Sequence, residues 1–265
     1  MKMYIVDAFA EKVFQGNSAA ICITDSWMNE DKMQAIAAEN NLSETAFIVK
    51  EGEVYHIRWF TPLYEIDLCG HATLASAFII DNYIDPNKEI INFTSQSGDL
   101  QVKCRDGFYT LNFPSRPPQK IEKLKEVEEV LGIEIKELFT SRDLMAVVEN
   151  ENIIKNLTPN FDKMKDLSIG DGIIVTAEGS DCDFVSRCFY PKCGVNEDPV
   201  TGSAHCNLIP YWSERLGKTK MNAKQISERG GILYCKDCGD RVEITGKAVI
   251  YAIRDRKSTR LTSSH

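Results

Sequence analysis

The chain has 265 residues and a mass of 29.9 kDa, with 43% hydrophobic and 26% charged residues, a composition typical of globular proteins with a buried core. Its net charge of −8, with Lys and Arg dispersed among acids, argues against nucleic acid as a partner. Because no apolar run approaches the roughly 18 residues of a membrane helix and the start MKMYIVDAF has no signal-peptide pattern, we expect a cytoplasmic protein without a membrane partner.

The first half of the chain reads as strands interrupted by two helices. The strand-like runs MYIVDAF and AAICI precede a segment whose apolar spacing predicts a helix near residues 29–39. Strands TAFIVK and VYHIRWF follow, and then a helix over about residues 70–82. Strands EIINFTS, LQVKC and YTLNF complete this half, which we predict to be a domain of residues 1–113.

The second half begins after PSRPPQ, whose three prolines are typical of a linker. A stripe of Ile121, Leu124, Val127 and Leu131 predicts a helix near residues 120–131, and the strand–helix–strand order then repeats. We predict a second domain at residues 119–255. The polar segment 256–265 has no periodicity and is expected to be disordered or an added tail.

An internal repeat connects the two halves. The segments HIRWFTPLYEIDLCGHATLASAFIIDNY and FVSRCFYPKCGVNEDPVTGSAHCNLIPYW align without gaps through a shared R-x-F-x-P, and this register places Cys69 on Asp198. The helical segments ATLASAFII and SAHCNLIPYW are apolar on almost every side, so each should be enclosed by its own strands. The sequence therefore predicts an α/β fold of two pseudo-symmetric domains, each a curled mixed sheet around a central helix.

The repeated segments suggest an anion site where each central helix begins. Asp198-Pro199 is typical of an N-cap followed by proline at the first helical position, and the amides and hydroxyls of Thr201, Gly202 and Ser203 follow. The twin start is Cys69-Gly70-His71, where a helix N-terminus is expected to lower the pKa of the thiol. If both starts converge on one cleft, that cleft suits a small carboxylate.

Other interpretations of these residues remain open. Asp198 could be only a structural cap, and a metal site from Asp198, His205 and His71 lacks the i, i+4 spacing of zinc motifs. His205 lies in an apolar helix and is more typical of a core histidine. Glu44 in NNLSETAFIV could be a solvated loop acid, or a proton shuttle if it packs against apolar neighbours.

Taken together, these motifs resemble the phenazine-biosynthesis PhzF-like (PhzC/PhzF) family, whose fold is that of diaminopimelate epimerase. The resemblance extends from Asp7 to about Gly246, through DAFAEKVFQGNSAAIC, AAENNLSETAFIV, RWFTPLYEIDLCGHATLASA, FTSQSG, EDPVTGSAHC and QISERGG. It implies two pseudo-symmetric α/β domains with the active site between them, isomerase chemistry without a cofactor, and a homodimer.

The resemblance also implies roles for individual residues. Glu44 occupies the position of the glutamate that moves a proton, and His71, Asp198 and Ser203 occupy positions that orient the substrate and assist proton transfer. We expect further substrate contacts from Cys69, Gly70, Thr201 and Gly202, and no metal. Epimerase relatives use two cysteines, one at each helix start, whereas this chain offers Cys69 opposite Asp198.

The resulting hypothesis is a cofactor-independent isomerase that moves a proton on a small carboxylate-bearing substrate by general acid/base catalysis in the interdomain cleft. One alternative is an amino-acid racemase or epimerase that uses Cys69 and Asp198 as opposed bases. Another is a small-molecule-binding protein that has the cleft but no catalytic activity.

Overall fold

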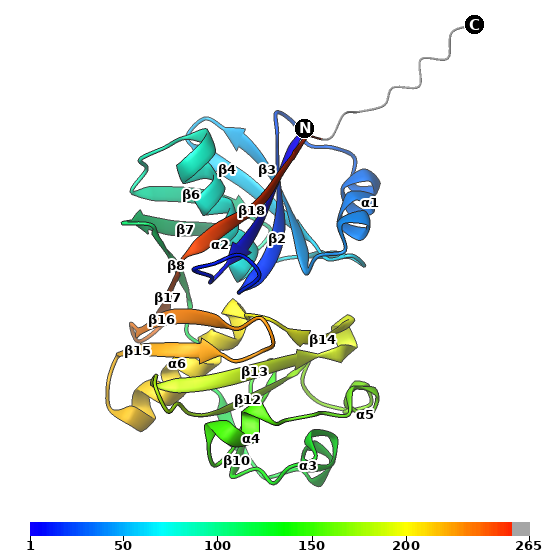
Figure 1. The fold of residues 1–265 in the computed structure, drawn as a ribbon, viewed down its shortest axis with the longest axis vertical. Coiled ribbons are helices and arrows are strands. Elements are labelled where there is room, and N and C mark those ends of the chain that lie inside the picture. The colour runs from blue at the N-terminus through cyan, green and yellow to red at the C-terminus, as the bar shows by residue number, and fades with distance from the viewer. Residues whose placement is uncertain (256–265) are drawn as a thin grey trace, which may run out of the picture.

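The computed structural model describes residues 1–255, and the tail predicted at 256–265 lies outside the described residues. The chain forms two lobes, each a curled sheet around a central helix (Figure 1). This arrangement confirms the predicted α/β fold with two pseudo-symmetric halves. Within residues 1–255, none of the helices has the length and apolar character needed to cross a bilayer.

The first lobe is built mainly from the N-terminal half of the chain. Its strands are β1 (Lys2–Ala8), β2 (Asn17–Thr24), β3 (Glu44–Glu51), β4 (Val54–Phe60), β5 (Glu65–Ile66), β6 (Ile90–Ser95), β7 (Gly98–Arg105), β8 (Phe108–Pro114) and β18 (Ala248–Asp255). Its helices are α1 (Glu30–Asn40) and α2 (Gly70–Ile79), and α2 continues into a π-helical turn, η1 (Ile80–Ile84).

The second lobe contains the remaining elements. Its strands are β9 (Gln119–Ile121), β10 (Glu137–Thr140), β11 (Leu144–Val147), β12 (Ile173–Glu178), β13 (Phe184–Tyr190), β14 (Val195–Asp198), β15 (Lys220–Gln225), β16 (Gly231–Asp237) and β17 (Arg241–Gly246). Its helices are α3 (Lys125–Leu131), α4 (Glu151–Lys155), α5 (Phe161–Lys165), the short 3-10 turn η2 (Pro191–Cys193) and α6 (Gly202–Leu216).

The strand pairings of the two lobes repeat in the same order and direction. In the first lobe β2–β3 and β4–β6 are parallel, whereas β3–β4, β6–β7 and β7–β8 are antiparallel. In the second lobe β11–β12 and β13–β15 are parallel, whereas β12–β13, β15–β16 and β16–β17 are antiparallel. The lobes join where β8 pairs with β17. The repeat seen in the sequence is therefore a structural duplication.

Each copy of the repeat ends in a strand that joins the sheet of the other lobe. After β8 the chain enters the second lobe through β9, which pairs with β10, and after β17 it returns through β18, which pairs with β1. The range predicted for the second domain, 119–255, thus includes a strand that lies in the sheet of the first lobe (Figure 1). Patterns along the sequence do not specify which sheet such a terminal strand joins.

The central helices are enclosed, as their apolar sequences predict. All residues of α2 except Phe78 are buried, and so are ten of the fifteen residues of α6. Both helices contribute to one large apolar cluster that includes strands of both lobes. Burial of this kind is the main source of stability, so the helix starts rest on a firmly packed scaffold.

The helix predicted at 120–131 is only partly present. Residues Gln119–Ile121 form β9 instead, because they pair with β10 in a register that places Ile121 opposite Leu138. The helix α3 begins at Lys125, and Ile121 and Leu124 still pack against the apolar cluster of the second lobe. Pairing with a neighbouring strand has overridden the helical spacing of the apolar residues.

Candidate active site

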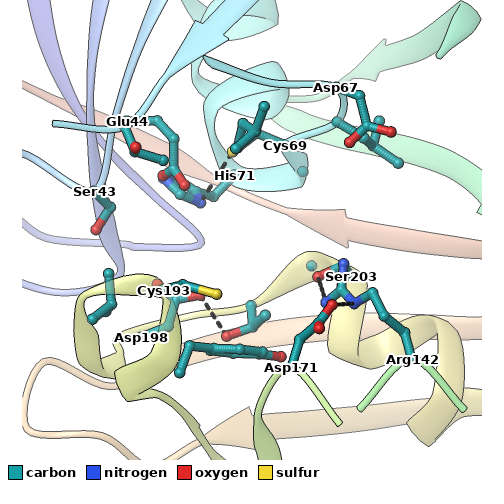
Figure 2. A pocket seen from close by; sticks show the side chains of 18 of the residues that line it. Ser43, Glu44, Asp67, Cys69, His71, Arg142, Asp171, Cys193, Asp198 and Ser203 are labelled. Atoms are coloured by element: carbon teal, nitrogen blue, oxygen red, sulfur yellow. Dashed lines mark hydrogen bonds and ion pairs between the residues drawn. The ribbon is translucent and has the colours of Figure 1, made fainter. Parts of the chain in front are cut away.

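A cavity of about 260 Å³ lies where the two central helices begin (Figure 2). Side chains of both lobes line it. All of the residues predicted for the site are among them, namely Glu44, Cys69, Gly70, His71, Asp198, Thr201, Gly202 and Ser203. The convergence of the two helix starts on one cavity follows from the duplicated fold.

The two helix starts touch each other at Gly70 and Gly202. A Cβ atom added to either glycine would lie 3.3 Å from the Cα atom of the other. The N-cap residues are Cys69 for α2 and Thr201 for α6, and neither side chain caps its helix. The positive ends of two helix dipoles therefore meet beside the cavity, which favours a bound anion.

Asp198 is not the N-cap of α6, contrary to the prediction. It is the last residue of β14, and α6 begins four residues later with Thr201 as its N-cap. Its carboxylate nevertheless serves the helix start, because Asp198 Oδ2 accepts a hydrogen bond of 2.6 Å from Thr201 Oγ1. The short strand β14 places Asp198 beside the helix rather than at its end.

The gapless register of the repeat is wrong after the R-x-F-x-P motif, because every position from the following glutamate through the helix starts is shifted by three residues. Arg58 forms a bidentate ion pair with Glu65, and Arg187 forms an equivalent bidentate pair with Glu197. Glu197 therefore corresponds to Glu65, although the gapless register places it on Leu68. The second lobe has three extra residues between the motif and this glutamate.

The corrected register changes the partner of Cys69. Each is the N-cap of its central helix, so the structural counterpart of Cys69 is Thr201. Asp198 corresponds instead to Ile66, since Asp198 pairs with Cys188 in the strand position where Ile66 pairs with Trp59. The symmetry therefore does not set Cys69 and Asp198 against each other as twins.

Glu44 and His71 form the most direct contact within the cavity. Glu44 begins β3, and its Oε2 lies 2.9 Å from His71 Nε2 in the first turn of α2. The other ring nitrogen of His71, Nδ1, lies 3.6 Å from Cys69 Sγ. Burial lowers the pKa of His71, but the facing Cys69 and Glu44 outweigh it and raise the pKa well above the usual value.

Burial has the opposite consequence for Cys69 from the one expected at a helix start. Desolvation, together with the nearby Glu44 carboxylate, raises the pKa of the Cys69 thiol to about 11. The partial charge at the helix start and the facing His71 do not compensate. Cys69 is therefore a neutral thiol near pH 7.

Asn17 joins the two sides of the cavity. It is fully buried, and its Nδ2 donates to Asp198 Oδ1 at 2.7 Å and to the Val200 carbonyl at 3.0 Å. The same nitrogen lies 3.2 Å from His71 Nδ1. The side-chain amide therefore lies between His71 of the first lobe and Asp198 of the second, and its two N–H groups bond Asp198 and the Val200 carbonyl.

Asp198 is an unusually basic carboxylate. Burial, which the Glu44 carboxylate reinforces and which His71 and the hydrogen bonds from Thr201 and Asn17 oppose, raises the pKa of Asp198 to about 6. A carboxyl group with such a pKa can gain or lose a proton near neutral pH. This property is what general acid/base catalysis requires.

The structure identifies lining residues that sequence reasoning did not single out. The most notable is Arg142, in the turn between β10 and β11, whose Nη2 lies 3.2 Å from Ser203 Oγ. Tyr64, Asp67, Asp171, Tyr190 and Cys193 also line the cavity. Their sequence contexts are ordinary turns and strand ends, so only the fold brings them together.

The structure separates the residues that could bind a metal ion from His205, which the sequence also suggests as a ligand. Glu44, Cys69 and His71 each offer a ligand atom, and these atoms lie within 4.8 Å of one another, so the three could hold a metal ion. His205 lies elsewhere: it is fully buried in α6, its Nδ1 is 2.8 Å from the Thr201 carbonyl, and burial lowers its pKa to about 4. His205 is a neutral core histidine and not a lining residue.

Comparison with known proteins gives a consistent picture. Residues 6–254 match the family model of phenazine biosynthesis-like proteins, PhzC-PhzF. The chain is 46% identical to an uncharacterized isomerase of Pseudomonas aeruginosa over 251 residues, which cover 95% of this chain and 96% of that protein. This relative, and two further relatives that are also named uncharacterized isomerases, confirm the prediction that the chain is an enzyme of the isomerase class.

Solved structures agree with the fold. A phenazine biosynthesis protein of the PhzF family from Enterococcus faecalis superposes with a TM-score of 0.93 at 53% identity, covering 95% of this chain and 97% of the other. A predicted epimerase from Pseudomonas aeruginosa shares the fold, with a TM-score of 0.73 at 15% identity and coverage of 96% and 98%. By motifs, whole-length similarity and fold, the chain belongs to the phenazine biosynthesis-like PhzC-PhzF family.

Proposed function

We propose that this isomerase moves a proton on a small carboxylate-bearing substrate held in the cavity between the lobes, with Glu44 as the group that carries the proton. The observation that carries the proposal is the contact of 2.9 Å between Glu44 Oε2 and His71 Nε2. Both residues line the cavity. A carboxylate paired with an imidazole can pass a proton in either direction.

The reaction begins when the Glu44 carboxylate removes a proton from a carbon next to an electron-withdrawing group of the substrate. The electron pair of the broken C–H bond delocalises into that group. The helix starts at Gly70 and Gly202 stabilise the developing negative charge, because the N-terminal ends of α2 and α6 carry unpaired N–H groups and the positive ends of the helix dipoles. Protonation at a different carbon, or on the other face of the same carbon, completes the isomerisation without a cofactor.

His71 and Asp198 support this step in different ways. His71 keeps the Glu44 carboxylate in place and exchanges a proton with it. Asp198, with Asn17 between it and His71, provides a second group that titrates near neutral pH. Ser203 in the first turn of α6 offers a hydroxyl for hydrogen bonding to the substrate.

A racemase or epimerase that uses Cys69 and Asp198 as opposed bases is a second candidate. Both residues line the cavity, which favours it. The pKa of about 11 for Cys69 disfavours it, because a neutral thiol is a poor base near pH 7. This candidate predicts that Cys69→Ala abolishes exchange from one enantiomer while Glu44→Gln has little effect.

The test is hydrogen exchange with solvent. Cyclic and amino-acid carboxylates are incubated with the protein in deuterated water, and deuterium incorporation is followed by NMR. Labelling that is lost in Glu44→Gln and kept in Cys69→Ala supports the proposal. The opposite pattern supports the two-base racemase, and tight binding of carboxylates without any labelling supports a non-catalytic binding protein.

A further inference from the structure

Arg142 is the one arginine or lysine among the lining residues that the structure describes for the cavity. It lies in the turn between β10 and β11, on the side of the cavity that faces Glu44 and His71 (Figure 2). The other charged lining residues, apart from His71, are acids, namely Glu44, Asp67, Asp171 and Asp198. A negatively charged group of a bound molecule is therefore attracted to the part of the cavity that Arg142 lines.

The guanidinium of Arg142 is held in one orientation by its neighbour Asp143. Arg142 Nη2 donates to Asp143 Oδ2 at 2.9 Å, and Arg142 Nε donates to Asp143 Oδ1 at 3.4 Å. Asp143 is only 1% exposed and also accepts a hydrogen bond of 3.2 Å from the Tyr190 hydroxyl. A buried acid fixed from two sides leaves the guanidinium little rotational freedom.

The orientation leaves donors available toward the cavity. Arg142 uses Nε and Nη2, the latter also contacting Ser203 Oγ at 3.2 Å, whereas Nη1 has no hydrogen-bond partner within residues 1–255. Asp171 is a distant partner, with its Oδ2 3.9 Å from Arg142 Nε. The free N–H groups, the Ser203 hydroxyl and the start of α6 lie together, which suits the two oxygens of a carboxylate.

We propose that Arg142, oriented by Asp143, binds the carboxylate of the substrate at the start of α6 and thereby determines which end of the substrate faces Glu44. The proposal rests on the proposed function for its use of a carboxylate substrate. In this arrangement Arg142 and Ser203 hold one end of the molecule, and Glu44 and His71 act on the other end across the cavity. Asp143 is a positioning residue that acts through Arg142.

The probe for this proposal is benzoate, with benzamide as a neutral molecule of nearly the same shape. Isothermal titration calorimetry gives the Kd of each for the wild-type chain and for Arg142→Met. We expect the wild-type chain to prefer benzoate, and Arg142→Met to weaken benzoate binding about 10-fold to 100-fold while benzamide binding stays the same. Arg142→Lys keeps the charge but loses the planar guanidinium with its paired N–H donors, so its affinity for benzoate should lie between those of Arg142→Met and the wild-type chain.

Asp143→Asn separates orientation from folding. If Asp143 positions the guanidinium, Asp143→Asn weakens benzoate and leaves benzamide unchanged, whereas a merely structural defect would weaken both. The matched control is Arg105→Met, because Arg105 also precedes an aspartate, Asp106, but its side chain is 91% exposed at the end of β7. Its binding of both probes should equal that of the wild-type chain.

Three results would overturn the proposal. They are equal affinity of the wild-type chain for benzoate and benzamide, an unchanged benzoate Kd in Arg142→Lys and Arg142→Met, and no saturable benzoate binding up to its solubility limit. The experiment is independent of turnover. Binding of benzoate involves no proton transfer by Glu44, so a failure of the proton-transfer proposal would leave Arg142-dependent binding intact.

Discussion

Gly70 and Gly202 pack directly against each other, so that a Cβ atom on either would lie 3.3 Å from the Cα atom of the other. These glycines begin the two central helices, and their contact brings together two segments that are far apart in the chain. The duplicated fold thus produces a single site at its pseudo-symmetry axis rather than two separate ones. Glycine is required here by the close approach of two backbones.

Alanine at either glycine should harm the site more than the fold. The added Cβ must displace its neighbour by a few tenths of an ångström, and at Gly70 it also meets the Phe113 ring at 3.3 Å. We expect Gly70→Ala and Gly202→Ala to lower the free energy of unfolding by about 1 to 2 kcal/mol, which exceeds the gain in helix propensity. Exchange rates should fall at least about tenfold because the helix starts move apart.

Urea unfolding and deuterium exchange measure the two effects separately. The double variant should lose more stability than the sum of the single variants, because the two new methyl groups face each other. Wild-type stability and exchange in both single variants would show that the close contact has no functional consequence.

Asn17→Asp should destabilise the chain strongly. The substitution puts a second carboxylate within hydrogen-bonding distance of Asp198, where the buried amide of Asn17 now donates at 2.7 Å. We expect a loss of about 3 kcal/mol or more in the free energy of unfolding at pH 7.5, with part of it recovered at pH 5 because the two carboxyl groups can then share a proton.

Asn92→Asp is the matched control for this change. Asn92 is exposed on β6 and accepts a hydrogen bond from Gln101, which an aspartate can also accept. It should remain within about 0.5 kcal/mol of the wild-type chain, as surface substitutions usually do. Equal losses in the two variants, or no pH dependence for Asn17→Asp, would contradict the bridging role of Asn17.

Asp198→Asn should make the chain more stable at neutral pH. The pKa of Asp198 in the folded chain, about 6, lies above its usual value of 3.8, so the fold favours the protonated form. The stability that comes from this shift is fully present below about pH 4 and is lost as the pH rises through about 6. An asparagine removes the buried charge, and the gain at pH 7.5 should be on the order of 2 kcal/mol.

Thermal unfolding across this pH window checks the sign. The Asp198→Asn variant should unfold at a higher temperature than the wild-type chain at pH 7.5, and the difference should shrink toward pH 4. A constant difference at all pH values would mean that burial of the Asp198 charge is not its cause. A gain of stability on substitution is typical of positions where function requires a strained or desolvated group.

Arg187→Met should be more damaging than Arg58→Met, although the two arginines occupy equivalent positions. Arg187 pairs with Glu197 and also donates to the carbonyls of Ile154 and Leu157 at the end of α4, at 3.1 and 2.8 Å. We expect a loss of about 3 kcal/mol for Arg187→Met and about 1 kcal/mol for Arg58→Met in urea unfolding. The reverse order would contradict the view that Arg187 secures the α4 segment.

The sequence predicts the lining of the cavity better than its geometry. Glu44, His71 and Ser203 lie in short motifs with distinctive composition, so motif position alone locates them at the cavity. Asp198 is also located, but its predicted role as a helix cap is wrong because Asp198 ends β14 and α6 begins only at Gly202, with Thr201 as its N-cap. A gapless alignment has no means of detecting an insertion whose flanking residues keep the same character.

Other features depend on contacts between distant segments. Arg142 is an isolated charge in an ordinary turn, and its place beside Ser203 depends on the packing of β10 and β11 against α6. The return of β18 to β1 and the pairing of β9 with β10 are likewise choices among sheet edges that periodicity does not specify. The pKa of Cys69 depends on burial, which overrides the effect of the helix start.

The most direct test compares two glutamates on the same strand. Glu44 and Glu51 are the first and last residues of β3, and each faces a histidine, with Glu51 Oε2 3.4 Å from His56 Nε2 on the surface. Deuterium incorporation into the carboxylate that the wild-type chain labels fastest is measured for Glu44→Gln and Glu51→Gln. We predict a loss on the order of a hundredfold or more for Glu44→Gln and the wild-type rate for Glu51→Gln. Exchange at the wild-type rate in Glu44→Gln would contradict the assignment of Glu44 as the proton carrier.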